Sequence, residues 1–186
     1  MIFNASLATC RGFLVVLLAA FIPLASFADQ PVKSIAELDL SRYMGTWYEI
    51  AKLPNWFQRK CVQGTQAQYK ILGPQKIEVT NKCTTATGEE IKAVGVARPH
   101  SSGQVAQLEV RFAPDWTAWL PVVWGAYWVL DLDPEYQLAA VGDPTRSYLW
   151  ILSRTPVVSA NQYERLLLRL KVMGFDISKL EKTRQN

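Results

Sequence analysis

Gly45-Thr46-Trp47-Tyr48-Glu49-Ile50-Ala51-Lys52-Leu53 is the stretch that decides the fold, and it has the composition of a β-strand. Aromatic and branched residues favour extended backbone, and strand alternation places Trp47, Glu49, Ala51 and Leu53 on one face. Seven similar segments follow it, separated by turn residues at intervals of about ten residues. The eight predicted strands span residues 45–53, 65–72, 76–83, 90–98, 107–112, 126–132, 136–141 and 148–154.

The links between these segments are mostly too short for a helical crossover, so successive strands should pair antiparallel in an up-and-down order. Eight such strands close into a barrel, which removes free edges and leaves an interior just wide enough for one small ligand. The predicted fold class is therefore an all-β, eight-stranded antiparallel barrel. After the last strand, Ser159 with Gln162 and then Gly174 predict the start and end of one helix. Its apolar stripe should pack on the outside of the barrel, and consists of Tyr163, Leu166, Leu167 and Leu170.

Alternation also predicts which side chains face the barrel interior. Leu108, Val110 and Phe112 alternate with charged residues, so these three should face inward. In segment 126–132, we assign to the interior the face that carries Trp128, Leu130 and Leu132. The residues predicted to line the lumen and mouth, and so to contact a ligand, are Glu49, Ala51, Leu53, Trp56, Phe57, Leu108, Val110, Phe112, Trp128, Leu130 and Trp150.

Three motifs are similar to those of the lipocalin family. Gly45-Thr46-Trp47 resembles the Gly-x-Trp that opens the lipocalin barrel at its closed end, and segment 131–136, ending in Tyr136, stands where lipocalins carry Thr-Asp-Tyr. Arg154 matches the third motif. The resemblance covers nearly all of the chain after residue 28 and is closest to bacterial lipocalins. It implies structural roles for Gly45, Trp47, Tyr136 and Arg154, and a hydrophobic ligand such as a fatty acid or lysophospholipid, for transport or storage in the cell envelope.

The strand order predicts where these motifs meet. If the first strand runs from the closed end to the open end, all three motifs lie at the closed end. The Arg154 guanidinium should then stack on the Trp47 indole, an interaction on the order of 1 kcal/mol, and its other donors should bond to carbonyls of the N-terminal segment. The same order places Cys61 and Cys83 at the open rim.

The first 28 residues are typical of a secretory signal peptide. Arg11 precedes the apolar run 13–27, which ends in Ser26-Phe27-Ala28, so cleavage is predicted after Ala28. Residues 29–186 would then form one lipocalin domain in the periplasm or outside the cell. A retained anchor helix is the alternative. Because Cys10 lies ahead of the apolar run, no lipoprotein cysteine stands at the cleavage site.

Cleavage leaves two cysteines, Cys61 and Cys83, in a chain addressed to an oxidising compartment. We expect them to form a disulfide, and two buried free thiols are the alternative. Loss of Arg11 reduces the 20 basic residues to 19, against 16 acidic residues, a net charge of +3. Charges so few and scattered predict no nucleic-acid partner.

Two apolar loops, residues 53–57 and 116–124, are predicted at the open end, where loops normally lie in water. The second loop could fold inward as a lid, contact a membrane, or pair with another protomer in a homodimer, and it would do so through Trp116, Trp119, Leu120 and Trp124. Near the mouth, Arg59, Lys60 or Arg146 could pair with a lipid head group.

No catalytic residues, metal site or cofactor are predicted. After cleavage the chain has a single histidine, His100, in a turn at the closed end, which suggests no catalytic triad. Two alternatives to a lipid carrier remain open. One is a partner-binding envelope protein whose barrel is filled by side chains, and the other is a lipid-modifying enzyme that uses a free Cys61 or Cys83.

Overall fold

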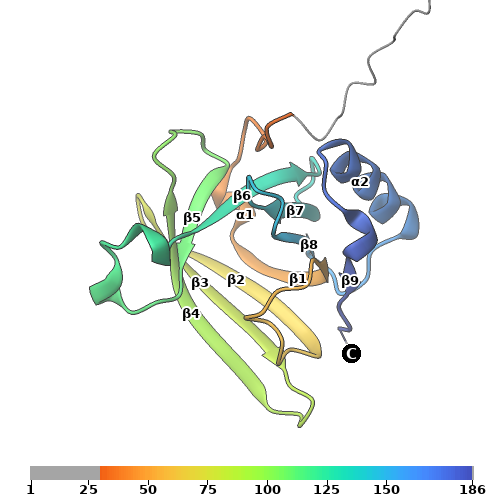
Figure 1. Cartoon of the computed structure of the whole chain (residues 1–186), viewed down its shortest axis with the longest axis horizontal. Coiled ribbons are helices and arrows are strands. Elements are labelled where there is room, and N and C mark those ends of the chain that lie inside the picture. Colours follow the sequence, from red (N-terminus) through yellow and green to blue (C-terminus); the bar gives the residue numbers. More distant parts are fainter. Residues whose placement is uncertain (1–29, 186) are drawn as a thin grey trace, which may run out of the picture.

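The computed structural model describes residues 30–185, and the predicted signal peptide, residues 1–28, lies outside them. Figure 1 shows one barrel with a helix packed against its side. The strands are β1 (Gly45–Lys52), β2 (Gln63–Gly73), β3 (Lys76–Thr84), β4 (Glu90–Pro99), β5 (Gln107–Arg111), β6 (Gly125–Leu132), β7 (Leu138–Gly142), β8 (Leu149–Ser153) and β9 (Glu181–Lys182). Short 3₁₀ turns cover Asp115–Thr117, Pro121–Val123 and Ile177–Lys179.

Each strand from β1 to β8 pairs antiparallel with the next, and β8 pairs with β1 to close the barrel. The predicted fold class is therefore confirmed. Strand β9 was not predicted from the sequence. This strand joins the same edge of β1 that β2 occupies, but farther along, where Ala51 and Lys52 lie opposite Lys182 and Glu181. The last described residues thus fill the place where β1 and β2 separate.

Among residues 30–185, two α-helices accompany the strands. The short α1 (Leu40–Tyr43) begins at Asp39, whose carboxylate accepts backbone hydrogen bonds from Ser41 and Arg42. The longer α2 (Ala160–Val172) begins at Ser159, whose hydroxyl accepts from the backbone of Gln162, as predicted.

Apolar side chains form two separate clusters. The first fills the lower barrel, near the closed end, and consists mainly of Tyr43, Trp47, Tyr69, Ile77, Val79, Leu108, Tyr127, Val129, Val141 and Leu152. The second lies between the outer wall and α2, and consists of Val32, Ala51, Leu53, Leu130, Leu138, Ala140, Leu149, Ile151, Leu166, Leu170 and Phe175. Because α2 covers the outer face of β6, β7 and β8, both faces of these strands are apolar. Alternation alone therefore does not identify their inner face.

A β-bulge in β1 corrects part of the predicted lining. The pairing with β8 shifts between Glu49 and Ala51, so Glu49 lies opposite Leu152 of the inner cluster, whereas Ala51 lies opposite Ile151 of the outer cluster. One extra residue inverts the alternation that follows it. Ala51 and Leu53 are buried, but outside the barrel, and their predicted lumen position was wrong.

In β6 the inner face was assigned wrongly. Val129 lies opposite Val141 of the inner cluster, and Trp128 lies opposite Gly142 and packs with Leu130 in the outer cluster. A second bulge between Val129 and Asp131 then returns Leu132 to the inner side, where it packs on the inner cluster. Trp128 and Leu130 therefore do not line the lumen, while Leu132 does face inward.

Candidate functional site

The closed end is held by Arg154. Its guanidinium carbon lies 4.0 Å from the centre of the buried Trp47 ring. Its Nη1 donates to the carbonyl of Thr46 at 2.9 Å, Nη2 donates to that of Arg42 at 2.7 Å, and Nε donates to that of Tyr136 at 3.3 Å. This is the contact set expected from the three motifs, and it joins the N-terminal segment to the last barrel strand.

Tyr136 and Gly45 support this arrangement. The Tyr136 hydroxyl accepts a hydrogen bond from the backbone of Asp39 at 2.9 Å, and the Arg42 guanidinium lies over its ring. Gly45 has a φ of +93°, a conformation that favours glycine, and a Cβ there would lie 3.4 Å from Arg154 Nη1. These four motif residues seal the barrel base and are remote from the mouth.

Three buried tyrosines form the floor of the interior. The hydroxyls of Tyr43 and Tyr127 lie 2.9 Å apart, and Tyr127 donates to Tyr69 at 2.8 Å. Burial raises the pKa of Tyr69 to about 12 and the pKa values of the other two well above their usual range. The rings leave a cavity of only about 10 Å³, at most the size of one water molecule. The lower barrel is therefore filled by side chains, and any ligand must lie above it.

Above the floor, the wall beside β4 and β5 is apolar and partly exposed. Strand β5 pairs with β4 only from Val96 to Pro99, so the first half of β4 extends past it. Phe112 follows β5 and remains 42% exposed, although its ring lies against the inward-facing Gly95. A Cβ on Gly95 would lie 2.7 Å from the Phe112 ring, so glycine is required for this approach. The half-buried Val110 continues the same wall toward the floor.

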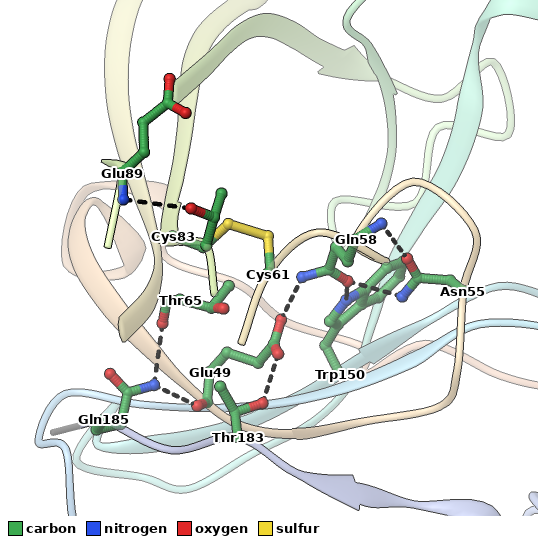
Figure 2. Close-up of a disulfide and its surroundings, with 11 residues drawn as sticks. Glu49, Asn55, Gln58, Cys61, Thr65, Cys83, Glu89, Trp150, Thr183 and Gln185 are labelled. Carbon is green, nitrogen blue, oxygen red and sulfur yellow. Dashed lines mark hydrogen bonds between the residues drawn. A yellow bond between two sulfur atoms is a disulfide. The ribbon is translucent and has the colours of Figure 1, made fainter. Parts of the chain in front are cut away.

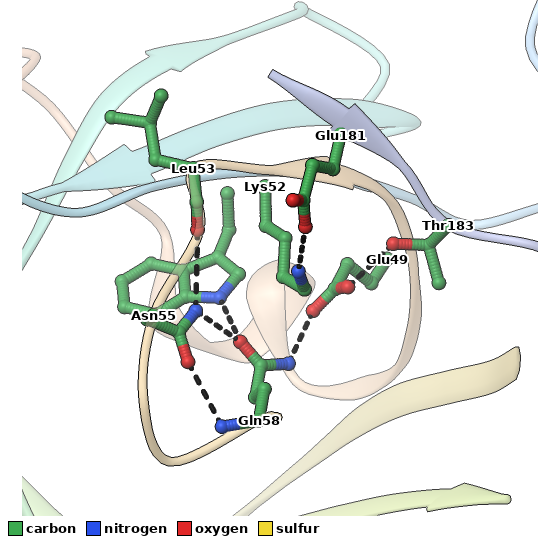
Figure 3. Close-up of polar contacts among 8 residues, drawn as sticks. Glu49, Lys52, Leu53, Asn55, Gln58, Glu181 and Thr183 are labelled. Atoms are coloured by element: carbon green, nitrogen blue, oxygen red, sulfur yellow. Dashed lines mark hydrogen bonds and ion pairs between the residues drawn. The ribbon is translucent and has the colours of Figure 1, made fainter. Parts of the chain in front are cut away.

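The opposite side of the mouth is polar. Figure 3 shows the Glu49 carboxylate between the loop after β1 and the C-terminal segment. It accepts hydrogen bonds from Gln58 Nε2 at 2.6 Å and from the Thr183 hydroxyl at 2.5 Å. Gln185 donates its amide to the backbone carbonyls of Glu49 and Thr65. Burial raises the pKa of the Glu49 carboxyl, and the two side-chain hydrogen bonds oppose that rise.

The loop of residues 53–60 lies across this polar side. Gln58 accepts hydrogen bonds from Trp150 Nε1 at 2.9 Å and from Asn55 at 2.7 Å, while Phe57 packs on the Trp150 ring. Trp56 stands out from the loop and is 71% exposed. The predicted mouth positions of Glu49, Phe57 and Trp150 thus lie together, whereas Trp56 contacts mainly Phe57.

The disulfide between Cys61 and Cys83 is confirmed, with a Cα–Cα distance of 5.5 Å. Figure 2 shows it beside the Glu49 network at the end of the loop. It fastens the loop to β3 at the open rim. Because both sulfurs are bonded, the enzyme alternative loses the free thiol that it required.

The loop of residues 113–124 does not form a lid. Its Trp124 ring lies 3.8 Å from the Arg98 guanidinium and 5.3 Å from that of Arg111, on the outer face of the wall. Trp116 and Trp119 are 76% and 77% exposed. Two arginine stacks therefore hold the loop against the outside, and Figure 1 shows it projecting from the side of the barrel.

None of the three basic residues suggested for a head group is buried in the mouth. Arg146 donates Nε to the carbonyl of Met173 at 2.8 Å and Nη2 to that of Gln30, so it fastens the end of α2 to the N-terminal segment. Arg59 and Lys60 are exposed on the loop. Lys52 is not among the residues predicted from the sequence to line the mouth, but the bulge turns it inward beside Glu181 (Figure 3).

Residues 30–185 contain no group of three or more His, Cys, Asp or Glu side chains placed to hold a metal ion. His100, after β4, accepts a hydrogen bond from the backbone of Ser102. Within the same range, no helix has the length and apolar character needed to cross a bilayer.

Comparisons with known proteins agree with this geometry. Residues 38–185 match the family model described as a lipocalin-like domain. The chain is 42% identical over 151 residues to temperature-induced lipocalin-1 from Arabidopsis thaliana, with 80% of each chain covered. It is 36% identical over 166 residues to outer membrane lipoprotein Blc from Citrobacter freundii, covering 87% of this chain and 89% of that one. It is 30% identical to apolipoprotein D from Mus musculus, with 96% and 93% covered.

Solved structures show the same fold. Insecticyanin from the tobacco hornworm Manduca sexta superposes with a TM-score of 0.64 at 25% identity, covering 82% of this chain and 83% of that one. The cockroach allergen Per a 4 gives a TM-score of 0.64 at 20% identity, with 87% and 97% covered. The chain therefore belongs to the lipocalin family, whose members bind small hydrophobic ligands.

Proposed function

We propose that this protein binds single-chain lipids, such as fatty acids or lysophospholipids, in the upper half of its barrel and carries or stores them in the cell envelope. The observation that supports the proposal is the apolar wall of the mouth. Phe112 is 42% exposed beside Gly95, although it lies on the inner side of β4. Side chains facing a barrel interior are normally buried, so this exposed surface favours a hydrophobic occupant.

The filled floor limits how much of a lipid enters. Burial of about eight methylenes at roughly 0.8 kcal/mol each contributes about 6 kcal/mol before ordering costs. This gain supports binding in the micromolar range when the polar head also finds partners. A short or medium acyl chain is therefore the favoured occupant.

Two measurements test the proposal. Lipids extracted with organic solvent from the purified protein are identified by mass spectrometry, and binding of dodecanoate to delipidated protein is followed by calorimetry. Phe112→Asp should weaken dodecanoate binding at least tenfold, because packing the acyl chain against a carboxylate would remove that charge from water. Val157→Asp is the matched control, since Val157 is 78% exposed after β8. Equal affinity of the two variants, or no lipid bound by the native protein, would refute the proposal.

The proposed site of action is the periplasm or the extracellular space, after removal of residues 1–28. The Cys61–Cys83 bond supports this location, because disulfides persist in oxidising compartments. Several relatives are named outer membrane lipoprotein Blc. Intact-mass measurement of the exported protein tests the cleavage point, and a mass that retains residues 1–28 would contradict it.

We also propose that Trp116 and Trp119 contact a membrane surface, since exposed indoles are favoured at the bilayer interface. The protein should sediment with vesicles of phosphatidylglycerol and phosphatidylcholine. Replacement of both tryptophans by serine should abolish its binding to the vesicles. Sedimentation velocity tests the other possibility. A dimer that the same double variant dissociates, without vesicle binding, would assign this loop to a homodimer contact.

A further inference from the structure

The β-bulge at Ile50 gives Lys52 a position inside the mouth. Lys52 lies opposite Trp150, whose ring packs on the inner cluster and whose Nε1 donates to Gln58. Ala51 is turned outward, so Lys52 takes the inner face that simple alternation assigns to its neighbour. Its side chain is only 13% exposed. Bulges often redirect a side chain at functional sites, and a cation on an inner wall needs a partner.

The partner present in the structure is easily replaced. Lys52 Nζ lies 2.7 Å from the carboxylate of Glu181, which is 57% exposed. If Glu181 moved away, water would solvate its carboxylate at little cost. The nearby Glu49 carboxylate is already bonded to Gln58 and Thr183. A ligand anion therefore competes with one exposed carboxylate for Lys52.

The mouth as a whole is amphipathic. Lys52, Glu181 and Thr183 lie on one side, along β1 and the C-terminal segment, while Val110 and Phe112 line the other side beside β4. An amphipathic molecule matches such a mouth when its head faces the polar side and its chain faces the apolar side.

We propose that Lys52 binds the anionic head group, a carboxylate or a phosphate, of a single-chain lipid, and that this head group replaces Glu181 at the lysine. The inference rests on the proposed lipid-binding function and adds the charge of the ligand and the residue that reads it. Lys52 is thus a specificity-determining residue, and Glu181 holds it in place until a ligand arrives.

The test compares three probes of equal chain length: dodecanoate, dodecyl phosphate and the uncharged dodecanol. Lys52→Met should weaken binding of one or both anionic probes about tenfold, the loss expected for one partly buried ion pair, and change dodecanol binding less than twofold. Lys52→Arg keeps the positive charge and should bind the anionic probes with nearly the affinity of the native protein. Glu181→Gln removes the competitor and should strengthen anion binding severalfold. Lys70→Met, which removes an exposed charge from the outer face of β2, should alter none of the affinities.

The outcomes separate this inference from the function on which it rests. If the native protein binds dodecanol and the anions equally, and Lys52→Met changes none of them, lipid binding stands and the head-group role of Lys52 is refuted. Equal weakening of dodecanol and dodecanoate by Lys52→Met would also refute it, because Lys52 would then act on packing. If no probe binds the native protein, both proposals fall. Of the two anionic probes, the one whose binding Lys52→Met weakens more identifies the natural head group as a carboxylate or a phosphate.

Discussion

Replacing Arg154 by methionine tests how the barrel is closed. Methionine keeps an apolar stem against Trp47 but removes the guanidinium, its three hydrogen bonds to carbonyls and its stack on the indole. Each hydrogen bond contributes about 0.5–1 kcal/mol at this partly exposed position, and the stack contributes about 1 kcal/mol. The expected loss in the free energy of unfolding is therefore about 3 kcal/mol. Arg154→Lys keeps a cation over the ring and one of the three hydrogen bonds, so we expect about half that loss.

Urea unfolding followed by far-ultraviolet circular dichroism measures these losses. The control for the stack is a double-mutant cycle with Trp47→Phe, for which a coupling energy of about 0.5–1 kcal/mol is expected. A loss below about 1 kcal/mol for Arg154→Met, or equal losses for the methionine and lysine variants, would refute the reasoning. The first result would mean that water replaces the guanidinium without cost, and the second that its planar geometry is unimportant.

Three further predictions concern the disulfide, the packing of α2 and the buried carboxyl of Glu49. Cys61→Ser should lower the free energy of unfolding by about 3 kcal/mol, because the bond joins residues 22 apart, and reduced native protein should match the variant in urea unfolding. Leu166→Ala, on the buried face of α2, should cost about 3 kcal/mol, whereas Leu168→Ala on its exposed face should cost less than about 0.5 kcal/mol; similar melting temperatures for the two would contradict the helix packing. Because burial raises the pKa of Glu49, the folded state loses stability as pH rises from the unfolded pKa to the folded pKa. Glu49→Gln should therefore be more stable than the native protein at about pH 8 and equally stable at about pH 4, and urea unfolding that shows no such difference would contradict the raised pKa.

The closed end could be predicted from the sequence because its residues act through local motifs and strand order. Trp47 and Arg154 lie at opposite ends of the chain's barrel segment, yet eight passages along the barrel, an even number, bring them to the same end. Cys61 and Cys83 follow from the same counting, since a loop and a strand end meet at the open rim. Such inferences need only the number of strands, and they tolerate errors of one or two residues in each boundary.

The inner face of each strand needs accuracy to a single residue, and there the prediction failed. Alternation assigned Ala51 to the lumen because no residue type marks the bulge at Ile50. In β6, Trp128 and Val129 are both apolar, since one faces the outer cluster beneath α2 and the other the inner cluster. A helix covering the outer wall removes the polar residues that would otherwise identify the outside. The inner face of a strand beside α2 is therefore difficult to identify from sequence.

The position of the loop of residues 113–124 could not be predicted for a different reason. Its apolar residues predict that some surface covers them, but the choice of surface depends on where the loop is held. Arg98 and Arg111 come from two strands, and they meet at Trp124 only once β4 and β5 are paired. With that ring held on the outer face, Trp116 and Trp119 remain exposed to solvent, and Phe112 on the apolar side of the mouth remains partly uncovered.

The bulge at Ile50 explains how one short strand serves two purposes. Before it, Trp47 and Glu49 face inward, and Trp47 completes the sealed base. After it, the small Ala51 faces α2, where a charged side chain would be buried against apolar surface, and Lys52 faces the mouth. Without the extra residue these roles would exchange, and a lysine would lie under the helix at a cost of several kcal/mol. The bulge thus separates a structural half of β1 from a half that is free to meet a ligand, and the C-terminal strand β9 binds only to that second half.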